Sequence, residues 1–454
     1  MKHTQIRTGT MKAHLMTRLL PVIALYSLAA PALALGGGSL PDTQATQITR
    51  QVEQKAGRVV ERAMDRRLEK RAEAKANRVR ERLAELPRAL SINTTTGQKA
   101  FNDVVLDDGF RAVERQWLVT GTASDIDSLS QPGITLLERR ELSGLGMTVA
   151  RFQVRPELDS RAALEDALPE LADRLDRNHI FEPQAGSEAA RPDADIPQWK
   201  SLCSTPARVG MVDTAIATDH PVFRNAQIVQ QRFLALADVN GELREPRDHG
   251  TAVASLMVGS REDQWPARLP EATVFNASVF YDRERSLSGA TLGHLLEGLN
   301  WLANQDLSVI NISLTGPDNR LLAAAVEALR AQGVLLVAAV GNQGPAAPPL
   351  YPAAYQTVVG VTAVDASGEL YRWANRGEQV LFAGPGVSVA VAHPDGGMVV
   401  DSGTSLAAPV VAAALACRRG DQSGEQAINA LTEEARDLGE RGRDTSFGHG
   451  FLDL

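Results

Sequence analysis

This sequence has few cysteines, no excess of positive charge and few long apolar runs. Only two cysteines, Cys203 and Cys417, occur among 454 residues, so the chain can close at most one internal disulfide. The formal net charge is −8, which argues against a general nucleic-acid-binding protein. No segment beyond residue 34 is apolar over enough residues to predict a transmembrane helix. The hydrophobic fraction of 44% is ample for a core, and the length predicts a large domain with accessory segments.

Residues 1–34 are predicted to be a secretory signal. Basic residues between Lys2 and Arg18 precede an apolar run at 19–25, and small residues at 30–34 offer cleavage sites. The basic part is long, so Met11 is an alternative start. The apolar region that begins with this run is interrupted by Pro21 and Pro31 and is short for a membrane span. The expected location is therefore secreted or periplasmic, with no transmembrane segment after removal of the signal.

Residues 35–100 are predicted to contain a charged helical arm. Apolar or alanine side chains recur about every four positions from Ile48 to Ala72, and a similar stripe continues to Leu86, with Arg, Lys and Glu between them. This narrow stripe predicts a long solvated helix that docks on its own protein or on a partner. A coiled coil is an alternative, although the spacing is nearer four than three and a half. Binding to an acidic surface is a second alternative, weakened by the interspersed acids.

Residues 101–185 are predicted to form a small α+β domain. Strand patterns occupy residues 115–121, 134–139, 147–154 and 178–183, and helical patterns lie at 124–130 and 160–171. The resulting order, β-α-β-β-α-β, describes a ferredoxin-like unit. Residues 186–200 are rich in Ala, Pro, Asp and Ser and lack periodicity, so we expect a linker there.

Three short motifs carry the candidate chemistry. Asp213 ends a short apolar run, His249 begins a helix of small residues, and Ser405 lies in the first turn of an apolar helix after Gly403. Each motif alone has an ordinary structural interpretation, as a turn cap, a structural histidine or a capped core helix. Together they supply a carboxylate, a base and a nucleophile in the chain order Asp, His, Ser, which is one of the known orders of serine hydrolases.

With these motifs the chain resembles the subtilisin-like serine peptidases, or subtilases, from about Ala207 to its C-terminus. The matching strings are Val-Asp-Thr at 212–214, His-Gly-Thr-Ala-Val-Ala at 249–254, Gly-Asn-Gln-Gly at 341–344 and Gly-Thr-Ser-Leu-Ala-Ala-Pro at 403–409. The resemblance implies a catalytic triad of Asp213, His249 and Ser405, with Asn342 in the oxyanion hole. It implies a mainly parallel sheet with helices on both faces for residues 201–454.

The same resemblance identifies residues 101–185 with the inhibitory propeptide of the family, the alternative being an unrelated exported domain. It also implies a substrate-binding strand formed by Ser313, Leu314, Thr315 and Gly316. The family usually has glycine where Thr315 stands, so we expect a narrowed first specificity pocket and a preference for small or medium P1 side chains. Ala215 and Leu406 also depart from the common pattern, but both changes preserve side-chain size well enough to leave the mechanism intact.

No cofactor is implied for the bond-breaking step, and a structural calcium ion stays open. Glu262 and Asp263 offer oxygen ligands after the histidine helix, but two adjacent acids are usually a solvated turn. Cys203 and Cys417 lie before the strand of Asp213 and at the end of the helix of Ser405. If strand and helix are antiparallel, the two cysteines lie at the same end of the domain. A disulfide bridge between them and two separate buried thiols are then both possible.

These observations predict an exported serine endopeptidase that is made as an autoinhibited precursor, with protein or peptide substrates and its own propeptide as inhibitor. We expect the strand and linker to pass through the cleft like a substrate, with self-cutting between Gln184 and Pro197. Two alternatives stay open. One is an exported binding or scaffold protein on a subtilase fold, with the helical arm as its working part. The other is an esterase that uses the same triad.

Overall fold

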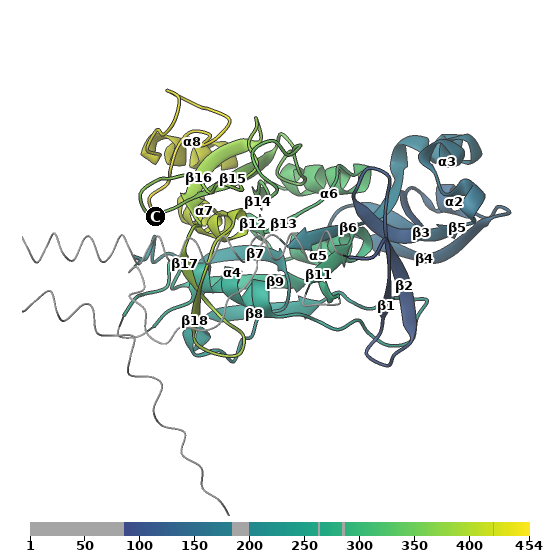
Figure 1. Cartoon of the computed structure of the whole chain (residues 1–454), viewed down its shortest axis with the longest axis horizontal. Coiled ribbons are helices and arrows are strands. Elements are labelled where there is room, and N and C mark those ends of the chain that lie inside the picture. The colour runs from purple at the N-terminus through teal and green to yellow at the C-terminus, as the bar shows by residue number, and fades with distance from the viewer. Residues whose placement is uncertain (1–85, 184–198, 262–263, 284–286, 421) are drawn as a thin grey trace, which may run out of the picture. The chain divides into compact units, whose positions relative to one another are not determined.

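A computed structural model describes residues 86–183, 199–261, 264–283, 287–420 and 422–454 of the chain (Figure 1). The predicted signal peptide, the arm up to residue 85 and most of the predicted linker lie outside these residues. Every described element belongs to one compact unit of the chain. Across the described ranges, no helix combines the length and the apolar character needed to span a membrane.

The larger part of the described chain is built on a parallel sheet of seven strands in the order β16-β15-β14-β12-β7-β9-β8. Every pairing between neighbours in this sheet is parallel. The strands are β7 (Ala207–Asp213), β8 (Gln227–Arg232), β9 (Ala272–Ser278), β12 (Val309–Ile312), β14 (Leu335–Ala339), β15 (Val358–Val364) and β16 (Val380–Pro385). A parallel sheet is stable only when both faces are covered, which fits the nearly continuous apolar character of these strands.

Two hydrophobic cores lie on the opposite faces of this sheet. Alternate residues of a strand point to opposite faces, so Val337 and Ala339 of β14 join one core and Leu336 and Ala338 join the other. The first core contains helices α4 (Asp248–Val258) and α7 (Thr404–Arg419), and the second contains α5 (Leu292–Ala303) and α6 (Arg320–Ala331). The predicted fold class, a mainly parallel sheet with helices on both faces, is confirmed.

Residues 111–183 form the predicted β-α-β-β-α-β unit, with antiparallel strands in the order β4-β5-β3-β6. The elements are β3 (Arg111–Thr120), α2 (Ala123–Asp127), β4 (Ile134–Leu142), β5 (Met147–Val154), α3 (Arg161–Ala167) and β6 (Leu175–Pro183), with 3-10 turns at Pro156–Leu158 and Pro169–Arg174. The two helices pack on one face of the sheet through Trp117, Phe152 and Leu164 (Figure 1).

An antiparallel hairpin precedes this unit, and it corrects the predicted end of the helical arm at residue 100. Strand β1 (Ala89–Asn93) pairs with β2 (Lys99–Val105), and β2 pairs with β3. Leu90 and Ile92 are buried while their neighbours in β1 are exposed. This period of two belongs to a strand with one buried face, and the helical stripe that ends just before it obscures it in the sequence. We call residues 86–183, the hairpin together with the β-α-β-β-α-β unit, the N-terminal part.

Short elements complete the described chain. They are β10 (Tyr281–Asp282), β11 (Ser288–Thr291), β13 (Leu314–Thr315), β17 (Val389–Ala392), β18 (Met398–Asp401), α8 (Gly424–Glu434) and a 3-10 turn at Pro221–Phe223. Strands β17 and β18 form a separate hairpin, whereas β10, β11 and β13 join the sheet of the N-terminal part.

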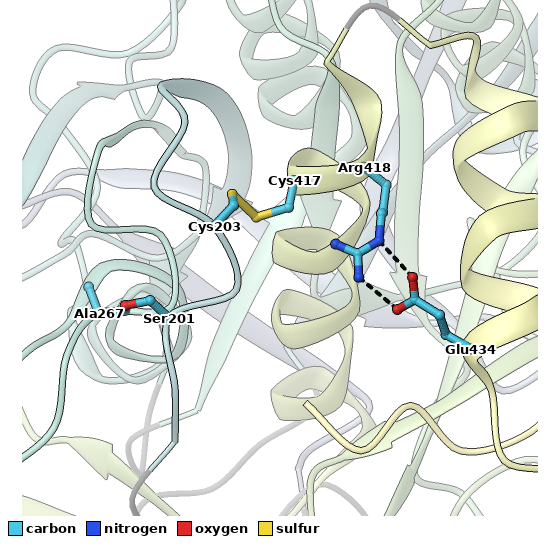
Figure 2. Close-up of a disulfide and its surroundings, with 6 residues drawn as sticks. All are labelled: Ser201, Cys203, Ala267, Cys417, Arg418 and Glu434. Carbon is cyan, nitrogen blue, oxygen red and sulfur yellow. Dashed lines mark hydrogen bonds and ion pairs between the residues drawn. A yellow bond between two sulfur atoms is a disulfide. The ribbon is translucent and has the colours of Figure 1, made fainter.

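A disulfide joins Cys203 to Cys417 at the end of the sheet opposite Asp213 (Figure 2). Cys203 lies before the start of β7, and Cys417 lies in the last turn of α7. The bridge therefore links the loop that leads into the aspartate strand to the end of the serine helix. Arg418 and Glu434 form an ion pair beside it, between α7 and α8. Of the two possibilities left open by the sequence, the structure contains the bridge.

Replacing either cysteine by alanine is expected to lower the free energy of unfolding by about 2–4 kcal/mol, because a long loop loses its cross-link. Cys203→Ala, Cys417→Ala and the double variant should have the same melting temperature in calorimetry, since all three lose one bond. Losses that add in the double variant would contradict the bridge. So would two free thiols in the unreduced, denatured wild-type chain.

Candidate active site

Strand β7 and helix α4 bring Asp213 and His249 together at the carboxyl edge of the parallel sheet. Oδ1 of Asp213 accepts hydrogen bonds from His249 Nδ1 and from the Thr214 backbone N–H, each at 2.7 Å. Asp213 is fully buried, and His249 is 7% exposed. The contact fixes which ring nitrogen carries the proton: Nδ1 donates to the carboxylate, which leaves Nε2 as the acceptor nitrogen.

Gly250 explains how the helix comes so close to the strand. A Cβ atom built at Gly250 would lie 2.3 Å from the carbonyl oxygen of Thr214, so any side chain would push the two elements apart. The Gly250 N–H donates to Thr214 Oγ1 at 2.7 Å. Thr251 Oγ1 in turn accepts from the Ala217 N–H at 2.8 Å. The motif His-Gly-Thr therefore holds the first turn of α4 against the residues that follow Asp213.

Ser405 is the second residue of α7, where backbone N–H groups have no partner within the helix. Its side chain is fully buried, yet its Oγ makes no hydrogen bond to any part of the chain that the structure describes. Nε2 of His249 is likewise buried and without a hydrogen bond among the described residues. Helices α4 and α7, which carry these two residues at their first turns, pack together in one core.

Asn342 follows β14 and faces the start of α7. Its side-chain oxygen accepts from both the backbone N–H and the hydroxyl of Thr404, each at 3.0 Å. These two bonds turn the amide so that its NH₂ group points away from Thr404. An amide N–H held next to the first turn of α7 is suited to bind a developing oxyanion.

The predicted substrate-binding residues lie at or beside β13. Ser313 Oγ donates to the Ser405 carbonyl at 2.9 Å and accepts from Asn311 at 2.9 Å, which ties this segment to the start of α7. Leu314 and Thr315 pair with strand β6 of the N-terminal part, and Gly316 forms a bridge with Tyr351. The expected P1 preference caused by Thr315 stays a prediction.

Asp213 raises the pKa of His249. Burial alone would lower this pKa, but the charge and the hydrogen bond of Asp213 outweigh it, with smaller contributions from Asp401 and Asp248. The imidazolium is therefore stabilised once the ring has taken up a proton.

No group of three or more His, Cys, Asp or Glu side chains suited to a metal ion occurs within the described residues. Glu262 and Asp263, the candidate calcium ligands, lie outside them.

Comparisons with known proteins show the family of the chain. Residues 205–450 match the model of the subtilase family, Peptidase_S8, which is more than half of the chain. The minor extracellular protease Epr of Bacillus subtilis (strain 168) is 34% identical over 216 residues, which cover 46% of this chain and 33% of that protein. Subtilisin DY of Bacillus licheniformis is 32% identical over 272 residues, which cover 58% of this chain and 94% of that protein.

A solved structure extends the likeness of fold. A serine-to-alanine mutant of the epidermin leader peptide processing serine protease EpiP from Staphylococcus aureus superposes with a TM-score of 0.58 at 16% identity. The superposition covers 74% of this chain and 97% of that structure. The fold and the family match define a serine-type endopeptidase. The chain belongs to the subtilase family.

The imidazole of His249 is expected to titrate above 6.5 in the full chain, because Asp213 stabilises its charged form. Asp213→Asn should lower this midpoint, since burial then acts without the carboxylate. NMR titration of the ring, with His249→Gln to assign its signal, measures the change. Asp248→Asn is the matched control, because that carboxylate contributes least and should shift the midpoint less. A midpoint that Asp213→Asn leaves unchanged would contradict the assignment of the partner.

Proposed function

We propose that this protein is an exported serine endopeptidase made as an autoinhibited precursor, with Asp213, His249 and Ser405 as its triad and Asn342 in its oxyanion hole. The observation that carries the proposal is the buried hydrogen bond from His249 to Asp213. Because Nδ1 is bound to the carboxylate, Nε2 is the ring nitrogen left to act as a base. The first turn of α7, a helix that packs with α4, supplies the buried hydroxyl of Ser405. These are the groups that covalent acyl transfer requires.

In the proposed reaction Ser405 Oγ attacks the peptide carbonyl carbon while His249 Nε2 takes up the hydroxyl proton. Asp213 keeps the ring in the required tautomer and stabilises the imidazolium. His249 then protonates the leaving amine, and the peptide C–N bond breaks to give an acyl-enzyme. Water, deprotonated by the same nitrogen, releases the acid and restores Ser405. The amide of Asn342 and the Ser405 backbone N–H are expected to bind the oxyanion in both steps.

Strand β6 supports the role of residues 101–185 as an inhibitory propeptide. It lies between two strands of the downstream chain and pairs antiparallel with β11 through Ile180 and Phe181, and with β13 through Glu182 and Pro183. The register on β13 runs from Thr315 towards Ser313, the residue that contacts Ser405. The end of β6 therefore approaches the serine as an extended substrate would, and the proposed self-cutting site follows between Gln184 and Pro197.

Phe181 is the apolar anchor of this strand. Its side chain is fully buried and belongs to the core of α5 and α6. A Cβ atom at Gly316 would lie 2.3 Å from the Phe181 ring, so glycine leaves the room that the ring occupies. Burial of such a ring stabilises the bound strand by roughly 1.5–3 kcal/mol relative to exposure.

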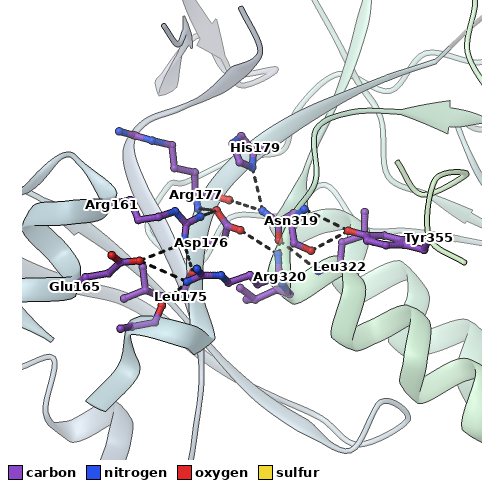
Figure 3. Close-up of polar contacts among 12 residues, drawn as sticks. Arg161, Glu165, Leu175, Asp176, Arg177, His179, Asn319, Arg320, Leu322 and Tyr355 are labelled. Atoms are coloured by element: carbon purple, nitrogen blue, oxygen red, sulfur yellow. Dashed lines mark hydrogen bonds and ion pairs between the residues drawn. The ribbon is translucent and has the colours of Figure 1, made fainter. Parts of the chain in front are cut away.

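Polar side chains of β6 reach the starts of helices α6 and α5, and Figure 3 shows those at α6. Asp176 accepts from the backbone N–H of Arg320 in the first turn of α6 at 3.0 Å, and Asn178 accepts from that of Gly293 in α5 at 3.2 Å. Asn319 caps α6 and also donates to His179 Nδ1 at 3.0 Å. Burial lowers the pKa of His179, which keeps the ring neutral and able to accept. The contacts satisfy N–H groups that a helix start leaves open.

Export is supported by the predicted signal at residues 1–34 and by the likeness to a minor extracellular protease. The rival scaffold function would predict no activity after removal of the N-terminal part, and a phenotype on deletion of the arm but not with Ser405→Ala. The buried Asp213–His249 bond favours the enzyme, because a scaffold gains nothing from it. Peptidases also cleave esters, so only a failure to cleave peptides would identify the protein as an esterase.

The full chain with Ser405→Ala is expected to stay uncut in a protease-free host and to take up no fluorophosphonate label, because it lacks the nucleophile. The wild-type chain should shorten and label at Ser405. Gel analysis, N-terminal sequencing and probe labelling measure this. Ser402→Ala, a buried serine just before the helix, is the matched control and should still shorten. Shortening of the Ser405→Ala chain would exclude self-cutting.

Asn342→Ala is expected to reduce kcat by about 100- to 1,000-fold, because one oxyanion donor is lost. The KM should change little, since the donor acts mainly on the transition state. Steady-state hydrolysis of a peptide substrate measures both constants. Gln343→Ala, at the exposed neighbouring residue, serves as the control and should keep the wild-type constants. An equally active Asn342→Ala enzyme would reject the assigned role.

A further inference from the structure

Arg283 is a buried cation, and its ion-pair partners among the described residues, Asp103 and Glu182, both belong to the N-terminal part. It follows β10, and its side chain is fully buried. Its Nε lies 3.0 Å from Asp103 of β2, and its Nη1 donates to Glu182 of β6 at 2.9 Å. Among the described residues, no acidic side chain from beyond the linker forms an ion pair with Arg283.

The guanidinium lies against Gly289 of strand β11, which pairs with β6. A Cβ atom at Gly289 would come within 2.6 Å of Nε and Nη2 of Arg283, so the glycine makes room for the flat group. Gly289 pairs with Tyr281 of β10, and the next residue, Ala290, pairs with Phe181 of β6. The arginine therefore lies against the strand that pairs with the inhibitory segment.

Glu182 shows which position of a bound strand the arginine meets. Successive side chains of a strand point to opposite sides, so Phe181 enters the apolar core while Glu182 turns towards Arg283. Within the described chain, Nη2 of Arg283 makes no hydrogen bond even with both acids in place.

We propose that Arg283 is a specificity-determining residue of the mature enzyme, which favours substrates with an acidic side chain at the position that matches Glu182. The inference rests on the proposed function, in which β6 occupies the cleft as a substrate does. Loss of the N-terminal part removes Asp103 and Glu182 together and leaves Arg283 on the cleft wall without either carboxylate. A substrate aspartate or glutamate then restores one of the two ion pairs.

The decisive experiment compares three quenched fluorescent peptides that copy residues 178–198, with Glu, Gln or Lys at position 182. The enzyme is the mature form obtained from the full chain. We expect kcat/KM for the Glu peptide to exceed that for the Gln peptide by about 5- to 10-fold, with the Lys peptide poorer still. The preference should shrink at high salt, because ions screen the pair.

Arg283→Gln should bring the ratio of the Glu and Gln peptides close to one, and Arg283→Glu should favour the Lys peptide. Arg330→Gln, which removes an exposed arginine of α6, is the matched control and should keep the wild-type ratio. Equal rates for the Glu and Gln peptides with the wild-type enzyme would overturn the inference even if neither Arg283 variant folds. An unchanged ratio in Arg283→Gln would also overturn it.

The two levels of the proposal fail in different ways. If no peptide is cut and no fluorophosphonate label is taken up, the proposed peptidase function fails, and the inference falls with it. If all peptides are cut without regard to position 182, the function stands and only the role of Arg283 is rejected.

Discussion

The close approach of helix α4 to the end of strand β7 is the constraint on which the candidate site depends. Parallel strands bring their carboxyl ends to one edge of the sheet, which places Asp213 there, but the helix that carries His249 must then reach it. Gly250 allows this, because a Cβ atom would lie 2.3 Å from the Thr214 carbonyl oxygen. A larger residue would move α4 outward and lengthen the 2.7 Å bond to Asp213, and such bonds weaken quickly with distance.

The sequence predicted much of this because its signals are local. Apolar runs with small residues after them marked the buried strands, and the motifs around Asp213, His249 and Ser405 each combined a strand end or helix start with a reactive side chain. The ferredoxin-like unit was predicted for the same reason, since its strands and helices alternate clearly. The disulfide needed three-dimensional proximity, so the sequence could only offer it as one of two possibilities.

Contacts between distant segments could not be predicted in this way. The alternation of Leu90 and Ile92 is a local signal for strand β1 of the hairpin. The charged helical stripe before it obscured this signal, so the predicted end of the helical arm, at about residue 100, lies too far along the chain. Nothing local marks Asp103 and Arg283 as partners, because the two residues lie far apart in the sequence. Their pairing depends on the way in which the hairpin packs beside β10, where Phe101 meets the ring of Tyr281.

Burial of the Arg283 charge costs free energy, and the N-terminal part offsets this cost only while that part is bound. A charged group taken out of water is stable when opposite charges surround it, and the two carboxylates that the described chain provides come from upstream of the linker. Gly289 makes room for the guanidinium from the downstream side, and its pairing with Tyr281 belongs to the downstream chain as well. The N-terminal part therefore supplies the opposite charges, while residues beyond the linker shape the space in which the guanidinium lies. This division is why the proposed role of Arg283 depends on the downstream residues keeping the arginine near β11 when another strand takes the place of β6.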